Sequence, residues 1–372
     1  MFTQNVQIEM HKIGIYKIVL VGLLAWVAGI IPVSAESLRV VSYNVENLFH
    51  PKHDTVIINE GVNGLTNEGR NGLPNERIIE KDDYEWTPDG ERRWSYTRYY
   101  RKVENIARVL TNIGEWDGVD IVGLQEVENA LCVKRLCYTL RPGEYDFVHY
   151  ESPDPRGIDV ALIYKKSRVD TIATRAIRVK PTPNPSLKGR GDELITRDIL
   201  YVQARVDKKD TLHFFVCHLP SQRGGAAESE WKRKIAREVL QSAVDSVLAI
   251  EPQAKIVIMG DFNGEPSNSP MKGVIYKRPN DKMSATKKSL NGENGVHGTH
   301  KYQGRWTCLD HFYTSPSLDS LSRAEIYNAA WIQEPDEKYL GLKPKRTFNG
   351  FRYQKDGFSD HLPILLKLKI KN

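Results

Sequence analysis

Residues 255–263 read KIVIMGDFN, a nearly continuous apolar run that ends in an acid and an amide. A short run of this kind is typical of a strand buried on both faces of its sheet, as in sheets covered by helices. Asp261 and Asn263 stand where the predicted strand ends, and ligand sites of α/β sheets collect at strand ends. The stretch therefore indicates an α/β protein with polar groups at one end of its strands.

The same pattern recurs along the chain. Alternating or continuous apolar residues predict further strands at 38–45, 120–124, 160–164, 199–206, 212–219, 309–313 and 363–368. Apolar residues at helical spacing predict helices over 98–113 and 228–248. Strands interleaved with helices and no convincing linker predict one domain over residues 36–372.

Two stretches lack such periodicity. Residues 50–95 are rich in Asn, Gly and charge, and we expect a long irregular excursion there. The Pro/Gly-rich stretch 180–191 is expected to be a loop. The formal charge of +6 suits a polyanionic substrate, but it suits many periplasmic proteins as well and excludes little.

The N-terminus resembles an export signal. Lys12 and Lys17 precede an apolar run over 18–33, and Val33-Ser34-Ala35 is a small-residue exit of the signal-peptidase type. The run is short beside the roughly 20 residues that a membrane span needs. We therefore expect a signal peptide over 1–35, cleavage near Ala35, no stable membrane span in the mature chain, and a periplasmic or secreted protein. An uncleaved anchor is the alternative.

The four cysteines show no CxxC pair and no zinc spacing; they are Cys132, Cys137, Cys217 and Cys308. Cys132 and Cys137 lie in a helix-like stretch, where a bridge would need a local loop. We interpret all four as small buried hydrophobes.

Acids, amides and two histidines follow the predicted strands and could converge on one cleft. They are Asn44, Glu46, Gln125, Glu126, His218, Asp261, Asn263, Asp310, Asp360 and His361. Alone, an Asp or Asn after a strand is more often a turn or a helix cap, and a lone His is usually structural. Their joint occurrence beside strongly apolar strands is costly unless they bind something.

These groups fit the hydrolysis of phosphate esters with a hard cation. Mg²⁺ takes few protein carboxylates or amides and keeps several waters. Hydrolysis needs an oriented water, which a His held by a carboxylate can activate, and a proton for the leaving oxygen. The sequence therefore favours a Mg²⁺-dependent phosphoesterase, with Mn²⁺ or Ca²⁺ as alternatives.

At these residues the chain resembles the endonuclease/exonuclease/phosphatase family, and in particular its exported bacterial branch. The motifs that match in order are YNVENLF (43–49), LQEVEN (124–129), RGIDVALIY (156–164), CHLPS (217–221), GDFN (260–263), LDHFY (309–313) and SDHLP (359–363). The resemblance implies the deoxyribonuclease I-like fold, an α/β four-layer sandwich of two packed mixed β-sheets flanked by helices.

For the metal, the resemblance implies that Glu126 is the principal Mg²⁺ ligand and that Asn44 assists it. Asp360 resembles a further carboxylate at the ion. These three residues are the metal ligands that we expect.

The resemblance also implies the catalytic residues. His361 resembles the histidine that, held by Asp310, acts at the scissile phosphate. Asp261 and Asn263 would orient the attacking water and the phosphate. His218 matches a position that contacts phosphate or the leaving group.

Basic and aromatic residues near these motifs are candidates for substrate binding: Arg98, Lys102, Tyr302, Arg305 and Trp306. Aromatic rings interleaved with Arg and Lys suit a nucleic acid strand, although ordinary packing beside solvated charges is an equal alternative.

We expect a monomeric exported nuclease; the alternative is a phosphatase or phosphodiesterase acting on inositol phosphates or phospholipid head groups. An inactive binding module is disfavoured by the complete set of acids and histidines, and abasic-site repair by export.

Overall fold

The computed structural model describes residues 37–53, 55–59, 76–180, 182–183, 193–266, 271–277 and 296–369. Leu38–Leu368 form one compact unit. The expected leader and its cleavage site lie outside the described residues. Within the described part of the chain, no helix is both long and apolar enough to cross a membrane.

The first sheet has six strands in the order β17-β22-β1-β4-β6-β5. Their bounds are β1 (Ser37–Leu48), β4 (Ile121–Val127), β5 (Tyr145–His149), β6 (Asp159–Lys165), β17 (Ser322–Ile326) and β22 (Ile364–Lys369). The sheet is mixed, because β1 pairs with β4 in parallel and β4 pairs with β6 antiparallel.

The second sheet also has six strands, in the order β13-β16-β12-β11-β10-β7. Their bounds are β7 (Val169–Ile177), β10 (Ile199–Val206), β11 (Asp210–His218), β12 (Lys255–Asp261), β13 (Ile275–Tyr276) and β16 (Asp310–Thr314). β11 and β12 run parallel, and β12 and β16 run antiparallel. As a result, β11 and β12 end at the same edge, where β16 begins.

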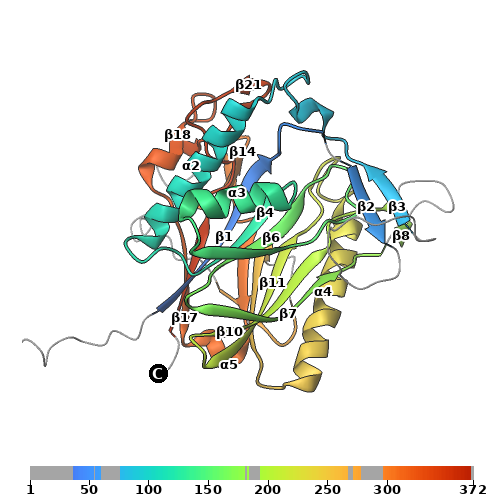
Figure 1. The fold of residues 1–372 in the computed structure, drawn as a ribbon, viewed down its shortest axis with the longest axis vertical. Coiled ribbons are helices and arrows are strands. Elements are labelled where there is room, and N and C mark those ends of the chain that lie inside the picture. The colour runs from blue at the N-terminus through green and yellow to red at the C-terminus, as the bar shows by residue number, and fades with distance from the viewer. Residues whose placement is uncertain are drawn as a thin grey trace, which may run out of the picture. The chain divides into compact units, whose positions relative to one another are not determined.

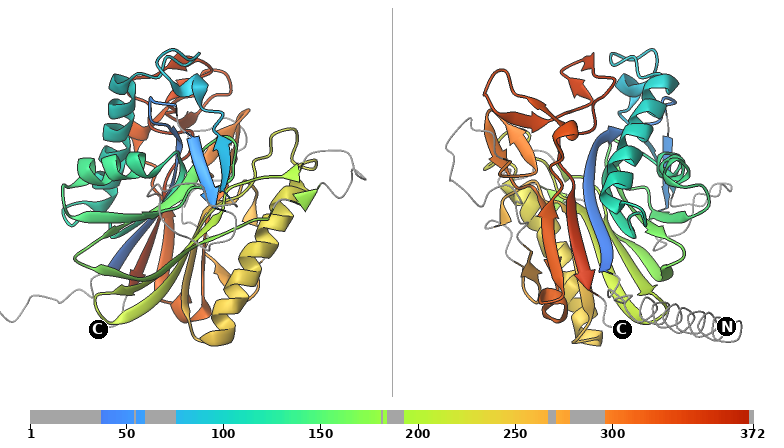
Figure 2. Two further views of the ribbon diagram at one scale, coloured as in Figure 1. Left: turned by 45° about the vertical axis from the view of Figure 1, so that its right-hand side comes forward. Right: turned by 90° about the vertical axis from the view of Figure 1, so that its left-hand side faces the viewer.

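The two sheets pack face to face with helices outside them. A Cβ on Gly123 of β4 would lie 2.7 Å from Met259 Sδ of β12, so the sheets are in close contact. Helices α2 (Tyr96–Gly114) and α3 (Ala130–Leu140) cover the outer face of the first sheet, and α4 (Glu230–Ile250) covers that of the second (Figures 1 and 2). Leu240 and Val244 of α4 pack in the same core cluster as Phe215 of the second sheet. The four-layer sandwich that the resemblance implied is confirmed.

Shorter elements complete the fold. They are β2 (Thr55–Asn59), β3 (Glu76–Glu80), η1 (Tyr84–Trp86), β8 (Thr182–Pro183), β9 (Glu193–Leu194), β14 (His300–Tyr302), β15 (Arg305–Thr307), α5 (Pro316–Asp319), η3 (Ala330–Ile332), β18 (Gln333–Pro335), β19 (Leu342–Pro344), β20 (Phe348–Asn349) and β21 (Arg352–Tyr353).

The expected irregular excursion over 50–95 is partly wrong, because β2 and β3 pair there as an antiparallel hairpin. The same stretch also contributes to the core. Trp86 stacks on Phe49 with ring centroids 4.8 Å apart, and its edge meets Trp94 and Phe348 at 5.8 and 5.5 Å. Trp86 and Trp94 are both buried, so they pack within the fold.

The cysteines behave largely as expected. None of the four forms a disulfide within the described part of the chain; Cys132, Cys137 and Cys217 are buried, whereas Cys308 is half-buried. Most of the expected loop 180–191 lies outside the described residues.

Candidate active site

One amide side chain joins the two sheets where their strands end. Asn44, near the end of β1, donates from Nδ2 to Asp261 Oδ2 at 3.0 Å and faces Glu126 Oε1 at 3.4 Å. Asp261 ends β12 of the second sheet, and Glu126 lies near the end of β4 of the first. Residues far apart in sequence are thus brought to one place.

Glu126 has an unusual backbone conformation. Its φ is +64°, in the left-handed region that few non-glycine residues adopt, and the pairing of β4 with β6 is irregular beside it. Such strain is typical of functional sites. Asn47 N donates to Glu126 Oε2 at 2.9 Å, and 14% of the side chain is exposed. The carboxylate is therefore held in place while solvent can still reach it.

Asp261 is fixed by its own neighbours. Asn263 N donates to Asp261 Oδ1 at 2.8 Å, and Asn263 Nδ2 donates to Leu219 O at 3.0 Å. Burial, with the Asp310 carboxylate adding to it and His361 opposing it, raises the pKa of Asp261 to about 7. A carboxyl group with such a pKa can exchange a proton near neutral pH.

Gly260 lets the strand before Asp261 lie close to β11. Its φ is +147°, and a Cβ there would meet Cys217 O at 1.9 Å. No other residue fits at this position without moving the backbone.

The structure brings together the two side chains that the resemblance paired. His361 Nδ1 and Asp310 Oδ2 are 2.7 Å apart, and His361 Nε2 lies 3.8 Å from Asp261 Oδ2. Burial opposes the charged ring, but the carboxylates of Asp310 and Asp261 prevail and raise the pKa of His361 well above its usual range. The imidazole is therefore held as a cation with Nε2 directed toward Asp261.

His218 has the opposite charge state to His361, because its imidazole is neutral. Its Nε2 lies 3.7 Å from Asp261 Oδ2 and 3.8 Å from Glu126 Oε1. Burial, together with the positive charges of Arg197 and Arg156, lowers the pKa of His218 well below its usual range. Its Nδ1 has no hydrogen-bond partner among the described residues. A neutral and a charged histidine thus lie on either side of Asp261.

Asp360 belongs to a neighbouring group of charges, which it forms with Arg346 and Glu46. Arg346 donates from Nη2 to Asp360 Oδ2 and from Nε to Glu46 Oε1, each at 3.1 Å. Burial opposes ionisation, but Arg346 and His361 lower the pKa of Asp360 to about 2. Burial raises the pKa of Glu46. Glu46 had a signal in the sequence, since it follows a strand as Asn44 does.

His300 also lies at this site, and the sequence analysis did not select it. Its ring centroid lies 4.9 Å from that of His361, and the two residues form an isolated β-bridge. Nothing in the local sequence marks it, because only the pairing of two distant segments places it here.

The donors at this site suit a divalent metal ion of hard character. Glu126 and Asp360 offer carboxylate oxygens, the ligands that Mg²⁺ prefers. His300, Asp360 and His361 also have potential ligand atoms within 4.8 Å of one another, but the protonated ring of His361 has no lone pair for a metal ion. Asn44 Oδ1 accepts from Glu46 N at 3.0 Å. In this orientation Asn44 Nδ2 positions the carboxylate of Glu126, and its Oδ1 keeps a second lone pair that a metal ion could use.

The residues expected at the substrate divide into two groups. Lys102 is wrong as a surface contact, because it is buried and its Nζ donates to Phe358 O at 2.7 Å and to Thr347 Oγ1. Arg98 is half-buried, with its guanidinium 4.7 Å above the Tyr353 ring.

The other three expected residues lie on the β14–β15 hairpin. Tyr302 is 67% exposed, Arg305 is exposed and Trp306 is half-buried. The hairpin begins at His300, which contacts His361, so these residues extend outward from the site.

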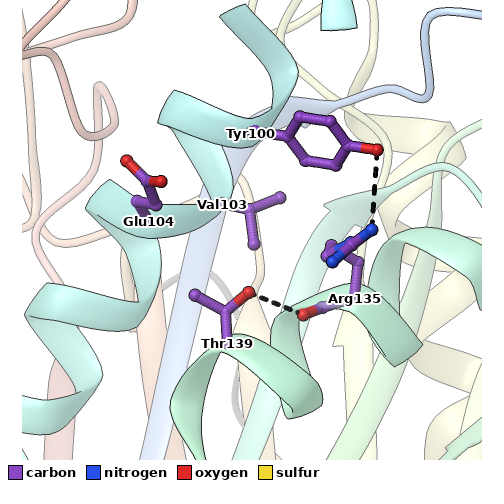
Figure 3. Close-up of a pocket in the computed structure, with 5 residues that line it drawn as sticks. All are labelled: Tyr100, Val103, Glu104, Arg135 and Thr139. Atoms are coloured by element: carbon purple, nitrogen blue, oxygen red, sulfur yellow. Dashed lines mark hydrogen bonds between the residues drawn. The ribbon is translucent and has the colours of Figure 1, made fainter. Parts of the chain in front are cut away.

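A separate hollow lies between α2 and α3 (Figure 3). It is lined by Tyr100, Val103, Glu104, Arg135 and Thr139. Arg135 Nη2 faces Tyr100 Oη at 3.5 Å, and Thr139 Oγ1 donates to Arg135 O at 2.9 Å. No member of the catalytic cluster lines it, so the hollow carries none of this chemistry.

Solved structures with the same fold include a phosphatase. Caenorhabditis elegans TDP2 matches with a TM-score of 0.51 and 15% identity, over 90% of this chain and 75% of that one. A mannosyl-6-phosphatase of Bacteroides thetaiotaomicron matches with a TM-score of 0.51 and 17% identity, over 90% and 100% of the two chains. At these identities the likeness shows the fold alone. A search among curated proteins gave no significant match.

The sandwich and the cluster of acids and histidines at its strand ends are typical of a hydrolase of phosphate esters. The chain belongs to the Endonuclease/Exonuclease/phosphatase family, whose model matches residues 39–370. Members of this family hydrolyse phosphate esters and typically depend on a divalent metal ion.

Proposed function

We propose that the protein is an exported, Mg²⁺-dependent nuclease that hydrolyses phosphodiester bonds of nucleic acid. The observation that carries the proposal is geometric: His218 Nε2 and His361 Nε2 lie 3.7 and 3.8 Å from Asp261 Oδ2, beside the partly exposed carboxylate of Glu126. This arrangement supplies a proton donor, a proton acceptor and a place for a cation within one cluster.

Each residue has a role that follows from its surroundings. The charged His361, fixed by Asp310, donates from Nε2 to a phosphate oxygen and stabilises negative charge there. Asp261 accepts the proton of the attacking water, and Asn263 holds that carboxylate in place. The neutral His218 contacts the phosphate or the leaving oxygen. Mg²⁺, held by Glu126 and Asp360, would polarise the phosphoryl oxygen.

Support for nucleic acid as substrate comes from the β14–β15 hairpin. Tyr302 presents an exposed ring and Arg305 an exposed guanidinium on a hairpin that begins beside His361. A base can stack on the ring while a neighbouring phosphate pairs with the guanidinium.

A phosphatase acting on monoesters, such as inositol phosphates, or an enzyme acting on phospholipid head groups is the second candidate. Arg346 favours the monoester phosphatase, because the guanidinium is held between Glu46 and Asp360 while 41% of its side chain remains exposed. A terminal phosphate carries more charge than a diester, and a planar guanidinium can pair with two of its oxygens. The solved mannosyl-6-phosphatase shows that a phosphatase can have this fold.

A substrate panel with Mg²⁺ separates the two. Plasmid DNA, RNA and bis-p-nitrophenyl phosphate test the nuclease, while p-nitrophenyl phosphate, inositol phosphates and sphingomyelin test the alternative. We expect Tyr302→Ala and Arg305→Ala to raise KM for nucleic acid several-fold. The exposed residues Tyr138 and Arg323 supply the matched controls Tyr138→Ala and Arg323→Ala. Turnover confined to monoesters or to sphingomyelin would reject the nuclease.

A further inference from the structure

A second cluster of metal-binding side chains lies at the end of the first sheet's β5–β6 pair. β5 ends at His149, which pairs with Ala161 of β6, and β6 begins at Asp159. Extending this register by two residues brings Glu151 opposite Asp159. Since side chains alternate along an extended chain, His149 and Glu151 point to the same side. Two carboxylates and an imidazole therefore gather at one point.

The distances within this cluster are those of ligands around one ion. The ligand atoms of His149, Glu151 and Asp159 all lie within 4.8 Å of one another. His149 Nε2 is 3.8 Å from Asp159 Oδ2, which is too long for a hydrogen bond. Two donors, each about 2 Å from a shared zinc ion, are held at separations of this order.

His149 has no other explanation for its burial. Its side chain is only 1% exposed, yet neither ring nitrogen has a hydrogen-bond partner among the described residues. A buried imidazole normally has partners for its donor and its acceptor, since leaving either unmade is costly. The bare ring beside two carboxylates points to a ligand that binds all three.

We propose that His149, Glu151 and Asp159 form a second metal site that binds one Zn²⁺ ion. The mixed donor set selects the ion, because an imidazole nitrogen suits zinc, whereas Ca²⁺ and Mg²⁺ prefer oxygen ligands throughout. Three protein ligands leave a fourth position for water.

Charge at the cluster agrees with this assignment. The only ammonium in contact is that of Lys81, whose Nζ lies 3.0 Å from Glu151 Oε2, so among the described residues two carboxylates share one cation.

The site would brace a loop that reaches the active site. Residues 150–158 connect the two strands, and within them Asp154 pairs with Arg197 at 2.6 Å. Arg156 Nη2 donates to Asn47 Oδ1 at 3.4 Å, and Asn47 N in turn holds Glu126. A zinc ion that joins the two ends of this loop would therefore help to hold Glu126 in position without taking part in catalysis.

Metal content tests the proposal directly. The protein, purified without a histidine tag and stripped by a chelator, is given one equivalent of Zn²⁺ and desalted. We expect one zinc per chain by atomic emission and by native mass spectrometry. His149→Ala and Asp159→Asn should lose this zinc, whereas Glu126→Gln, in the active site, should retain it. No bound zinc, equal retention in His149→Ala, or loss in Glu126→Gln would each overturn the assignment.

A second measurement does not depend on the variants folding. Crystals of the wild-type protein soaked in Zn²⁺ should show an anomalous peak at the zinc edge between His149, Glu151 and Asp159. A peak only beside Glu126 and Asp360 would reject the site. His149→Gln, which keeps a polar side chain of similar length, replaces His149→Ala if circular dichroism shows that the alanine variant is unfolded.

Discussion

At the scale of single residues, the charge states of the active site follow from which groups are buried together. His361 keeps its proton because Asp310 and Asp261 outweigh burial, while His218 loses its proton because burial is reinforced by Arg197 and Arg156. Two chemically identical side chains thus acquire opposite roles within one cluster.

The Asp310–His361 pair gives the first prediction. Removing the carboxylate in Asp310→Asn lowers the pKa of His361, so the limb of the pH–rate profile that reports this residue should move to lower pH, and turnover should fall. His361→Ala should cost at least as much. The double variant should cost little more than His361→Ala, because the two residues act as one unit.

Kinetics of the two single variants and the double variant over a range of pH check this. If Asp310 merely caps a turn, Asp310→Asn would change stability by about 1 kcal/mol or less and leave the pH profile in place. Additive losses in the double variant would contradict the pairing.

Glu126 gives the second prediction. Glu126→Gln should remove most activity while leaving the melting temperature nearly unchanged, because one carboxylate is lost from a partly exposed site and not from the core. Omitting Mg²⁺ from the assay of the wild-type enzyme should have the same effect. Near-wild-type turnover of the variant at saturating Mg²⁺ would exclude Glu126 as the principal ligand.

At the scale of elements, α2 does more than cover the first sheet. Lys102 extends from this helix to the segment before the last strand, where Phe358 O and Thr347 Oγ1 accept its protons and Glu46 Oε2 lies 3.9 Å away. One buried ammonium thereby ties a helix to a loop that carries Arg346. The same contact explains why Lys102 does not reach substrate.

The third prediction follows from this tether. Burial, opposed by Glu46, lowers the pKa of Lys102 to about 8, below its value in the unfolded chain. Because the pKa is lower in the folded protein, the unfolded chain binds more protons at this group at alkaline pH. The free energy of unfolding therefore rises as pH rises above about 8, and this gain is lost as pH falls through that value. The free energy of unfolding of the wild type, relative to Lys102→Met, should rise by about 1 kcal/mol per pH unit between about pH 8.5 and about pH 10.

Urea unfolding of both proteins across this range measures the difference. Exposed Lys234→Met serves as the control, and its difference from the wild type should not vary with pH in this way. A constant difference for Lys102→Met would show that Lys102 ionises as it does in the unfolded chain.

At the scale of the whole molecule, the chain combines an enzymatic domain with an N-terminal segment of a different character. Residues 39–370 match the family, while the apolar run over 18–33 lies ahead of that match. The charged residues before the run and the small residues after it support export.

The fourth prediction is that the mature protein begins at Glu36. Because Val33-Ser34-Ala35 is a signal-peptidase type of exit, cleavage should follow Ala35. Intact mass and N-terminal sequencing of the periplasmic or secreted fraction check this. A mass that retains the 18–33 run would indicate an anchor instead.

The strands and helices were largely predictable from periodicity. The strand expected at 199–206 is β10, and the helices expected at 98–113 and 228–248 are α2 and α4 within two residues. The chain order of the motifs identified the family, and the strand ends located Asn44, Glu126 and Asp261, because polar groups beside apolar strands stand out locally.

Only the tertiary structure decided which of those groups meet. Asn44 and Asp261 are 217 positions apart, and their contact exists only because two sheets pack face to face. The same holds for Lys102 and Phe358, separated by 256 positions, where a lysine expected to bind substrate is buried. Periodicity reports one element at a time, whereas burial, charge state and the partners of His149 depend on what the fold places opposite each side chain.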